Sequence, residues 1–101
     1  MRARRKDGNH AAIKAALEAM GASVCDVYQL PGVLDIIVGY QGVDVRCEIK
    51  DPAQPLSKRN LTPAEKNVFA TWKGHTPFIL ETVEDCRKLL KHILFGINRH
   101  R

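Results

Sequence analysis

The sequence predicts one α/β domain in which a mixed sheet carries helices on its faces. Apolar residues recur at helical spacing in three segments, and short alternating or fully apolar runs that are typical of strands lie between them. The expected order of elements is helix, three strands, helix, strand and helix. Because 101 residues suffice for a single core, we expect one domain over residues 1–101.

The first helix is expected to follow the cap-forming segment 7–9. Its inward-facing residues recur at helical spacing: Ile13, Ala16, Leu17 and Met20. His10 lies one turn before Ile13 and belongs to the same face, so we interpret it first as a capping or partly buried histidine. The alternating segment 22–29 is expected to form the first strand, with Tyr28 as an ordinary sheet residue.

Two runs in the middle of the chain predict a β-hairpin. The run 33–38 is apolar except for Asp35, which is typical of a strand buried on both faces. The run 43–50 alternates between apolar and charged residues, so one face is expected in the core and the other carries charge. The glycine-bearing segment 39–42 connects the two runs and is expected to turn the chain back on itself.

The register of this hairpin decides how two carboxylates meet. A two-residue turn at 41–42 would set Asp35 directly opposite Glu48, whereas a four-residue loop would set it opposite Arg46 and diagonal to Glu48. Both registers place the two carboxylates on one face, about 5–8 Å apart. Like charges at that separation destabilise the fold unless a cation lies between them. Lys50 follows Glu48 on the same face, so we predict a metal site with a lysine beside it.

A polar segment and a second helix follow the hairpin. The segment 51–61 has no apolar pattern and is expected to be a surface loop, where Lys58 and Arg59 could contact a phosphate backbone. Thr62, followed by proline and then by Glu65, predicts a helix start with a capping box. Glu65 therefore has a structural role to begin with, and a role at the site ranks second.

A tryptophan, a short strand and a last helix complete the predicted fold. Trp72 continues the apolar face of the second helix and is expected in the core. The apolar run 78–80 is expected to form the last strand. Thr82 can cap a final amphipathic helix that ends near Gly96. Its inward residues recur at helical spacing: Val83, Cys86, Leu89, Leu90 and Ile93.

The composition favours an anionic partner. The net charge is +5, and basic residues crowd both ends of the chain. We expect residues 1–6 and 97–101 to be flexible basic tails. We expect no membrane span, because no apolar run reaches about 18 residues. We expect no signal peptide, because no apolar h-region follows the basic N-terminus. Three widely spaced cysteines match neither a zinc site nor a disulfide framework and indicate a reduced cytosolic chain: Cys25, Cys47 and Cys86.

The central hairpin carries a resemblance to a known family. Pro-Gly-Val-Leu-Asp at 31–35, followed by Glu-Ile-Lys at 48–50, resembles the PD-(D/E)XK nuclease superfamily, and most of all its small VRR-NUC and phage Holliday-junction-resolvase-like members. The resemblance covers roughly residues 6–90. It implies a restriction-endonuclease-like αβββαβ core, to which this chain adds a C-terminal helix.

The resemblance implies a metal-dependent DNA endonuclease that hydrolyses phosphodiester bonds, with selectivity for junctions or other branched DNA. Asp35 and Glu48 would bind one or two Mg²⁺ ions together with the backbone carbonyl of Ile49, and Mn²⁺ could substitute. Lys50 would orient the attacking water or stabilise the transition state. Asp35, Glu48 and Lys50 are thus the expected catalytic residues.

Further roles follow from the same resemblance. His10 stands near the place where the first helix of the family commonly contributes a glutamate or glutamine, and Glu65 stands where a glutamine often points to the site. The expected DNA contacts are basic residues of the N-terminus and the polar loop: Arg4, Arg5, Lys6, Lys58 and Arg59. A junction has two equivalent strands to cut, so a homodimer in the cytoplasm of a bacterium or phage-infected cell is implied.

Two other functions stay open. The chain could be a non-catalytic nucleic-acid-binding module that keeps the nuclease fold, which the histidine at position 10 favours. It could also be a restriction-type enzyme that cuts one sequence in linear duplex. The sequence has no glycine-rich phosphate loop, no Gly-x-Ser-x-Gly motif and no cluster of histidine and cysteine ligands.

Overall fold

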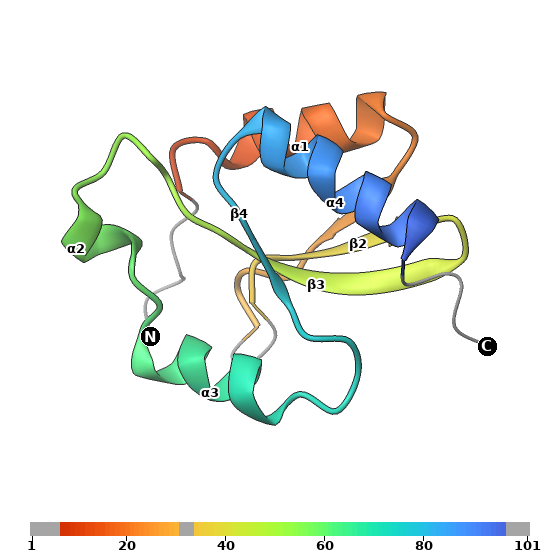
Figure 1. Cartoon of the computed structure of the whole chain (residues 1–101). Helices are drawn as coiled ribbons and strands as arrows, with labels where there is room; N and C mark the ends of the chain where they lie inside the picture. The colour runs from red at the N-terminus through yellow and green to blue at the C-terminus, as the bar shows by residue number, and fades with distance from the viewer. Residues whose placement is uncertain (1–6, 31–33, 97–101) are drawn as a thin grey trace.

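The computed structural model describes residues 7–30 and 34–96 (Figure 1). The predicted tails, together with Arg4, Arg5 and Lys6, lie outside the described residues, as does the segment 31–33 of the family motif. Within the described parts, four strands form one mixed sheet that is flanked by helices. No helix in these parts is long and apolar enough to cross a membrane.

The elements follow the predicted order with one addition. In chain order they are α1 (His10–Ala19), β1 (Ser23–Asp26), β2 (Ile36–Tyr40), β3 (Val43–Ile49), α2 (Leu56–Arg59), α3 (Pro63–Thr71), β4 (Phe78–Leu80) and α4 (Val83–Phe95). The addition is α2, a single turn of helix inside the segment that was predicted to be a loop. A segment this short has no apolar periodicity, so the sequence pattern could not reveal it.

The sheet has the strand order β1-β2-β3-β4. The first two pairs are antiparallel, and β4 runs parallel to β3. A parallel neighbour cannot be reached by a tight turn. The chain therefore crosses from β3 to β4 through α2 and α3, and α3 is placed on one face of the sheet by this crossover (Figure 1).

The hairpin between β2 and β3 has the two-residue turn. Gln41 and Gly42 both have positive φ, 52° and 78°, as a type I′ turn requires. Tyr40 pairs with Val43, as the two-residue alternative requires and the four-residue loop does not. With this register, Asp35, one residue before β2, lies opposite Glu48 as one of the two predicted registers required.

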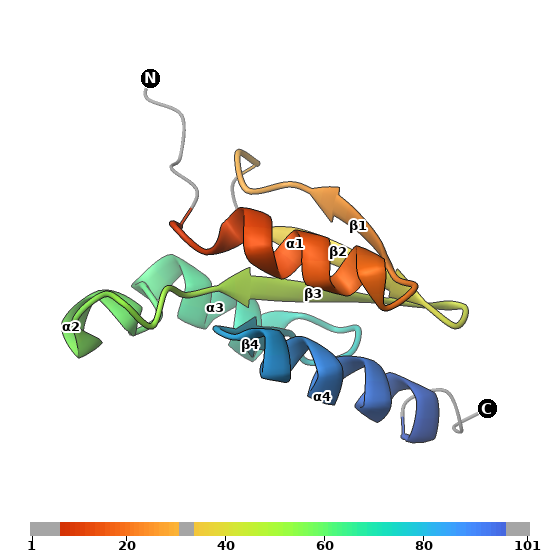
Figure 2. The same ribbon diagram turned by 90° about the horizontal axis from the view of Figure 1, so that it is seen from above.

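The two faces of the sheet have different neighbours. Helices α1 and α4 lie side by side on one face, and α3 lies on the other (Figures 1 and 2). The core between the sheet, α1 and α4 contains fully buried apolar side chains: Ile13, Leu17, Ile36, Val38, Cys47, Ile49, Cys86 and Ile93. The alternating charged residues of β3 point toward α3, where Glu48 and Lys50 are buried as well.

Two helices begin with the predicted capping boxes. At α3 the hydroxyl of Thr62 accepts from the N–H of Glu65, whose Oε1 accepts in return from the N–H of Thr62 at 2.9 Å. At α4, Thr82 and Asp85 form the same pair. Helix α1 differs, because Asn9 occupies the cap position without a side-chain capping bond. The capping role expected of segment 7–9 is therefore wrong for the side chain of Asn9.

Three expectations about single elements are wrong. Strand β1 ends at Asp26 because a turn follows, so Tyr28 lies outside the sheet, with its ring edge-on to His10 at 5.5 Å. Strand β2 begins after Asp35 because Leu34 has a φ of 69°, a conformation that interrupts a strand. Trp72 is 39% exposed, since α3 ends before it and the extended backbone takes it away from the helical face.

Candidate functional site

The two carboxylates that were predicted to converge share one face of the hairpin. Asp35 and Glu48 are 5% and 2% exposed. Asp35 is held by the backbone, because its Oδ2 accepts from the N–H of Ile49 at 2.7 Å and its own N–H donates to the carbonyl of Cys47 at 3.1 Å. The strained backbone of Leu34 lies directly before this carboxylate. The β2–β3 ladder thus fixes where Asp35 can point.

Glu48 is a buried carboxyl group that is short of donors. Its Oε1 is buried and has no hydrogen-bond donor among the described residues. Burial, the hydrogen bond with Glu65 and the negative charge of Asp35 raise the pKa of Glu48 to about 9. A proton on Glu48 would supply the hydrogen bond that three carboxylates cannot make among themselves. Without a cation, Glu48 is therefore neutral at pH 7.

Lys50 lies between Glu48 and Glu65 on this face. Its Nζ is 2.9 Å from Oε1 of Glu65 and 3.5 Å from Oε2 of Glu48, and the residue is 7% exposed. Burial alone would lower the pKa of Lys50, but the hydrogen bond to Glu65 and the charge of Glu48 outweigh it and raise the pKa above its usual value. Lys50 is a fixed cation at neutral pH.

Glu65 has both roles that were predicted for it, in the cap of α3 and at the candidate site. Its Oε1 closes the capping box of α3 and also accepts from the ammonium group of Lys50. Burial raises the pKa of Glu65, but the hydrogen bonds from Glu48, the N–H of Thr62 and Lys50 outweigh it and hold the pKa below its usual value. The start of α3 is therefore tied to the charged end of β3.

Asp7 is a site residue that the sequence reasoning missed. Burial raises its pKa, the charge of Asp35 raises it further, and the charge of Lys50 opposes both. The segment before α1 also approaches Asp51, because a Cβ on Gly8 would lie 2.8 Å from Oδ2 of that residue. An acidic residue just before a helix was visible in the sequence, but it was interpreted only as a possible cap.

The side chain of Asn9 connects α1 to this end of the sheet. Its Nδ2 donates to the backbone carbonyls of Lys50 at 3.0 Å and of Glu81 at 2.8 Å. These carbonyls belong to the residues that follow β3 and β4. Asn9 thus holds the backbone that carries Lys50, a contact between residues 41 and 72 positions apart that local sequence rules could not reveal.

His10 is buried, as its first interpretation required, and its hydrogen bond goes to β1. Its Nε2 is 2.7 Å from Oδ1 of Asp26, and Nζ of Lys14 is 2.8 Å from the other oxygen of Asp26. The hydrogen bonds from Lys14 and His10 lower the pKa of Asp26. This pair of bonds links α1 to β1, and no described contact joins His10 to Glu48 or Lys50.

The two predicted DNA contacts in the polar segment lie on α2. Lys58 is exposed. The side chain of Arg59 is 24% exposed, and its Nη1 lies 3.5 Å from the carboxylate of Glu81. Arg59 therefore already forms an ion pair within the fold. Lys58 is exposed and is the better placed of the two to contact a phosphate.

Comparison with known proteins adds no relative: no protein-family model, no curated protein and no solved structure matches this chain. The function therefore has to be argued from the residues themselves.

The charged face of the β2–β3 hairpin, which carries Asp35, Glu48 and Lys50, suits a divalent cation with hard oxygen ligands. Within the described residues, no group of three or more histidine, cysteine, aspartate or glutamate side chains is arranged to hold a metal ion. Mg²⁺ needs less, because it is commonly held by one or two carboxylates and keeps several waters. Asp35 and Glu48 supply two, and the Oε1 of Glu48 that has no donor can accept a cation once the carboxyl group has lost its proton.

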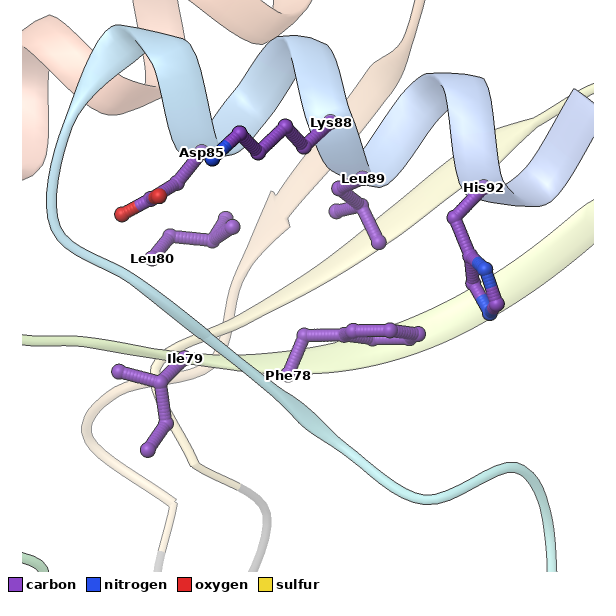
Figure 3. Close-up of a pocket in the computed structure, with 7 residues that line it drawn as sticks. All are labelled: Phe78, Ile79, Leu80, Asp85, Lys88, Leu89 and His92. Atoms are coloured by element: carbon purple, nitrogen blue, oxygen red, sulfur yellow. The ribbon is translucent and has the colours of Figure 1, made fainter.

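A hollow between β4 and α4 is a weaker candidate. It has a volume of about 250 Å³, and Phe78, Leu89 and His92 supply much of its lining (Figure 3). Its acidic residue, Asp85, already accepts from the backbone N–H groups of Glu81 and Thr82 as part of the cap of α4. The carboxylate in this hollow thus has a structural role, and the charged face beside β3 is the better candidate site.

Proposed function

We propose that this chain is a metal-dependent DNA endonuclease of the PD-(D/E)XK type. The proposal depends on one observation: the ionisable side chains of Asp35, Glu48 and Lys50 come together, buried, on one face of a β-hairpin. Burying charged groups costs free energy, so such a face is more readily explained by chemistry than by stability. The mixed sheet with its flanking helices is compatible with the restriction-endonuclease-like core that the motif implies.

Asp35 and Glu48 would hold Mg²⁺, or Mn²⁺ in its place, and the backbone carbonyl of Ile49 remains a predicted third ligand. The bound ion would polarise the scissile phosphate and lower the pKa of a water molecule. Glu48 must give up its proton before it can act as a ligand, because only the carboxylate binds a cation. Ion binding should therefore release a proton from the protein at neutral pH.

Lys50 is suited to charge stabilisation rather than to proton abstraction. Its raised pKa keeps the ammonium group protonated at neutral pH, so it cannot serve as a general base there. A compact cation can donate to a phosphate oxygen or orient a water molecule. Glu65 would be the positioning residue, since its hydrogen bond of 2.9 Å sets the direction of the Lys50 side chain.

The proposed substrate is branched DNA, and the proposed assembly is a homodimer that cuts two equivalent strands. The net charge of +5 and the exposed Lys58 suit contacts to the phosphate backbone, which position DNA without reading its sequence. Cleavage should then follow the shape of the DNA. A sequence-specific restriction-type enzyme would need additional contacts to base edges.

A non-catalytic DNA-binding module is the second candidate. One observation favours it: without a metal ion, Lys50 and Glu65 already form a hydrogen-bonded pair, and the neutral Glu48 adds little charge. Such a network could serve to position α3 alone. The two candidates differ in whether the chain breaks DNA.

Cleavage assays separate these candidates. A four-way junction and a linear duplex are each incubated with the wild type, Glu48→Gln or Glu18→Gln, in Mg²⁺ or in EDTA. Glu18 is exposed on α1, so its variant is a matched control. We expect Mg²⁺-dependent nicking of the junction that falls at least about 100-fold in Glu48→Gln alone. Binding without nicking by the wild type would favour the module.

A further inference from the structure

A second group of side chains lies beside the charged face. Arg46 precedes Glu48 by two residues on β3, so both point to the face that α3 covers, with Cα atoms about 7 Å apart. The guanidinium carbon of Arg46 lies 4.0 Å from the ring centroid of Trp72, the residue that directly follows α3. A cation and an aromatic ring are thus stacked next to the proposed cleavage site.

No ion pair joins the charge of Arg46 to an acidic side chain among residues 7–30 and 34–96. Its Nη1 is buried and has no hydrogen-bond acceptor within the described parts of the chain, and its only described interaction there is with the indole ring. A buried donor without an acceptor destabilises the protein. A guanidinium group that is stacked on an aromatic ring keeps its edge for planar, bidentate contacts, and phosphate oxygens supply such acceptors.

Trp72 is placed as a platform rather than as a core residue. It is 39% exposed, although large aromatic side chains are usually buried. The backbone of Gly74 packs against its edge, because a Cβ there would lie 2.8 Å from Nε1 of the indole. The ring is therefore held from one edge by Gly74 and from one face by Arg46, and it keeps exposed surface.

These residues line a hollow of about 210 Å³. This volume is below the range of about 300–1,000 Å³ for sites that take drug-sized ligands, so the hollow suits a single base or phosphate. Asp44 lines it as well, two residues before Arg46 on the strand. A phosphate would be repelled by Asp44 and would sit on the side of Arg46 that faces Glu48.

We propose that Arg46 and Trp72 form a subsite for one unpaired nucleotide of the DNA, adjacent to the phosphodiester that is cut. The base stacks on Trp72 and the phosphate contacts Arg46. The position relative to the cut rests on the nuclease function proposed above, whereas the binding itself does not. Duplex DNA keeps its bases stacked inside the helix, so this subsite selects DNA in which a base is unpaired, in a single-stranded segment or by opening at a branch point.

Trp72 is the only tryptophan of the chain, so tryptophan fluorescence, excited selectively over the two tyrosines, reports on this subsite. The protein in EDTA is titrated with a blunt duplex, with the same duplex carrying a single-stranded arm, and with the single strand. We expect quenching by the two DNAs that have unpaired bases, and little by the blunt duplex. Equal quenching by the blunt duplex, or no quenching while DNA binds, would overturn the subsite.

Three variants test the assignment by the anisotropy of labelled single-stranded DNA in EDTA. Because base–aromatic stacking is worth about 1–3 kcal/mol per base, Trp72→Leu should weaken binding roughly fivefold or more, and Arg46→Gln should weaken it as well. Arg87→Gln removes an exposed charge from α4, on the opposite face, and is the matched control. Thermal unfolding shows whether each variant is folded, and Arg46→Lys replaces Arg46→Gln if that variant unfolds.

Parallel reactions in Mg²⁺ separate this subsite from the nuclease function. Quenching without cleavage would support the subsite and contradict the endonuclease. Cleavage with equal binding by wild type, Trp72→Leu and Arg46→Gln would support the endonuclease and overturn the subsite. Absence of both binding and cleavage would overturn both proposals.

Discussion

The two faces of the sheet bury different kinds of residue. Toward α1 and α4, the side chains of Val45, Cys47 and Ile49 are 0–3% exposed and apolar. Toward α3, Glu48 and Lys50 are 2% and 7% exposed, yet they carry ionisable groups. The first face gains free energy from burial, about 25 cal/mol per Å² of apolar area. The second gains little, because desolvation of charges offsets their attraction.

This difference indicates a division of labour within one strand. Alternate residues of β3 serve the core and the candidate site, so the core face fixes the backbone on which the charged residues are held. Asn9 and Glu65 add further restraint, because they tie the end of β3 to α1 and α3. A rigid, dry setting is what a group that stabilises charge in a transition state requires.

The largest effect on stability is expected from Lys50→Met. The change leaves the carboxylate of Glu65 buried without its cation, and breaking a buried ion pair in this way costs about 3–5 kcal/mol. The double variant Lys50→Met/Glu65→Gln should recover most of that loss and remain inactive. Urea unfolding measures both. A loss below about 1 kcal/mol in the single variant would mean that the pair contributes little on this face.

On the core face, Ile36→Ala should lower the free energy of unfolding by about 2–5 kcal/mol, because the side chain is fully buried and a cavity remains. Ile79→Ala is the matched control, since Ile79 lies in β4 but is 43% exposed. Urea unfolding of the two variants compares them directly. Equal losses would contradict the assignment of the core to the α1–α4 side.

The pH dependence of stability separates the two faces further. In EDTA, the folded protein keeps a proton on Glu48 up to about pH 9, whereas an ordinary glutamate with a pKa of 4.5 loses it. The unfolded state is therefore stabilised relative to the folded state as pH rises through this interval, because only the unfolded state releases this proton. The free energy of unfolding should fall by up to about 1.4 kcal/mol per pH unit. Glu48→Gln should remove that slope between pH 6 and 8. A wild-type profile that is flat or rising there would contradict the neutral Glu48.

The smallest loss of stability is expected from variants of the two capping boxes. Thr62→Ala and Thr82→Ala should each cost about 1 kcal/mol, since each removes one capping bond. Only Thr62→Ala should also slow cleavage, because the Glu65 that completes its box also holds Lys50. Cleavage rates at equal folded fractions measure the difference. Equal rates would mean that α3 does not position Lys50.

The sequence predicted the features that follow from local rules. The capping residues Thr62 and Thr82 and the strand 78–80 depend on neighbours in the chain, and the turn at 41–42 was one of two turn lengths that the sequence allowed. Because alternation and turn length set the register of a hairpin, the meeting of Asp35 with Glu48 followed from the same rules.

The features that the sequence did not predict depend on contacts between residues that are far apart in the chain. The approach of Asp7 to Asp35, the hydrogen bonds of Asn9 and the bond of His10 to Asp26 arise when α1 packs on the sheet. The exposure of Trp72 followed from where α3 ends, which apolar spacing fixes only to within a turn. Sequence periodicity does not contain this information.

Soaking crystals in Mn²⁺ tests the central claim most directly, because anomalous scattering locates the ion. We predict one peak within coordination distance of both Asp35 and Glu48, and none in crystals of Glu48→Gln. A peak elsewhere, or no peak at these carboxylates at a Mn²⁺ concentration that supports cleavage, would contradict the account.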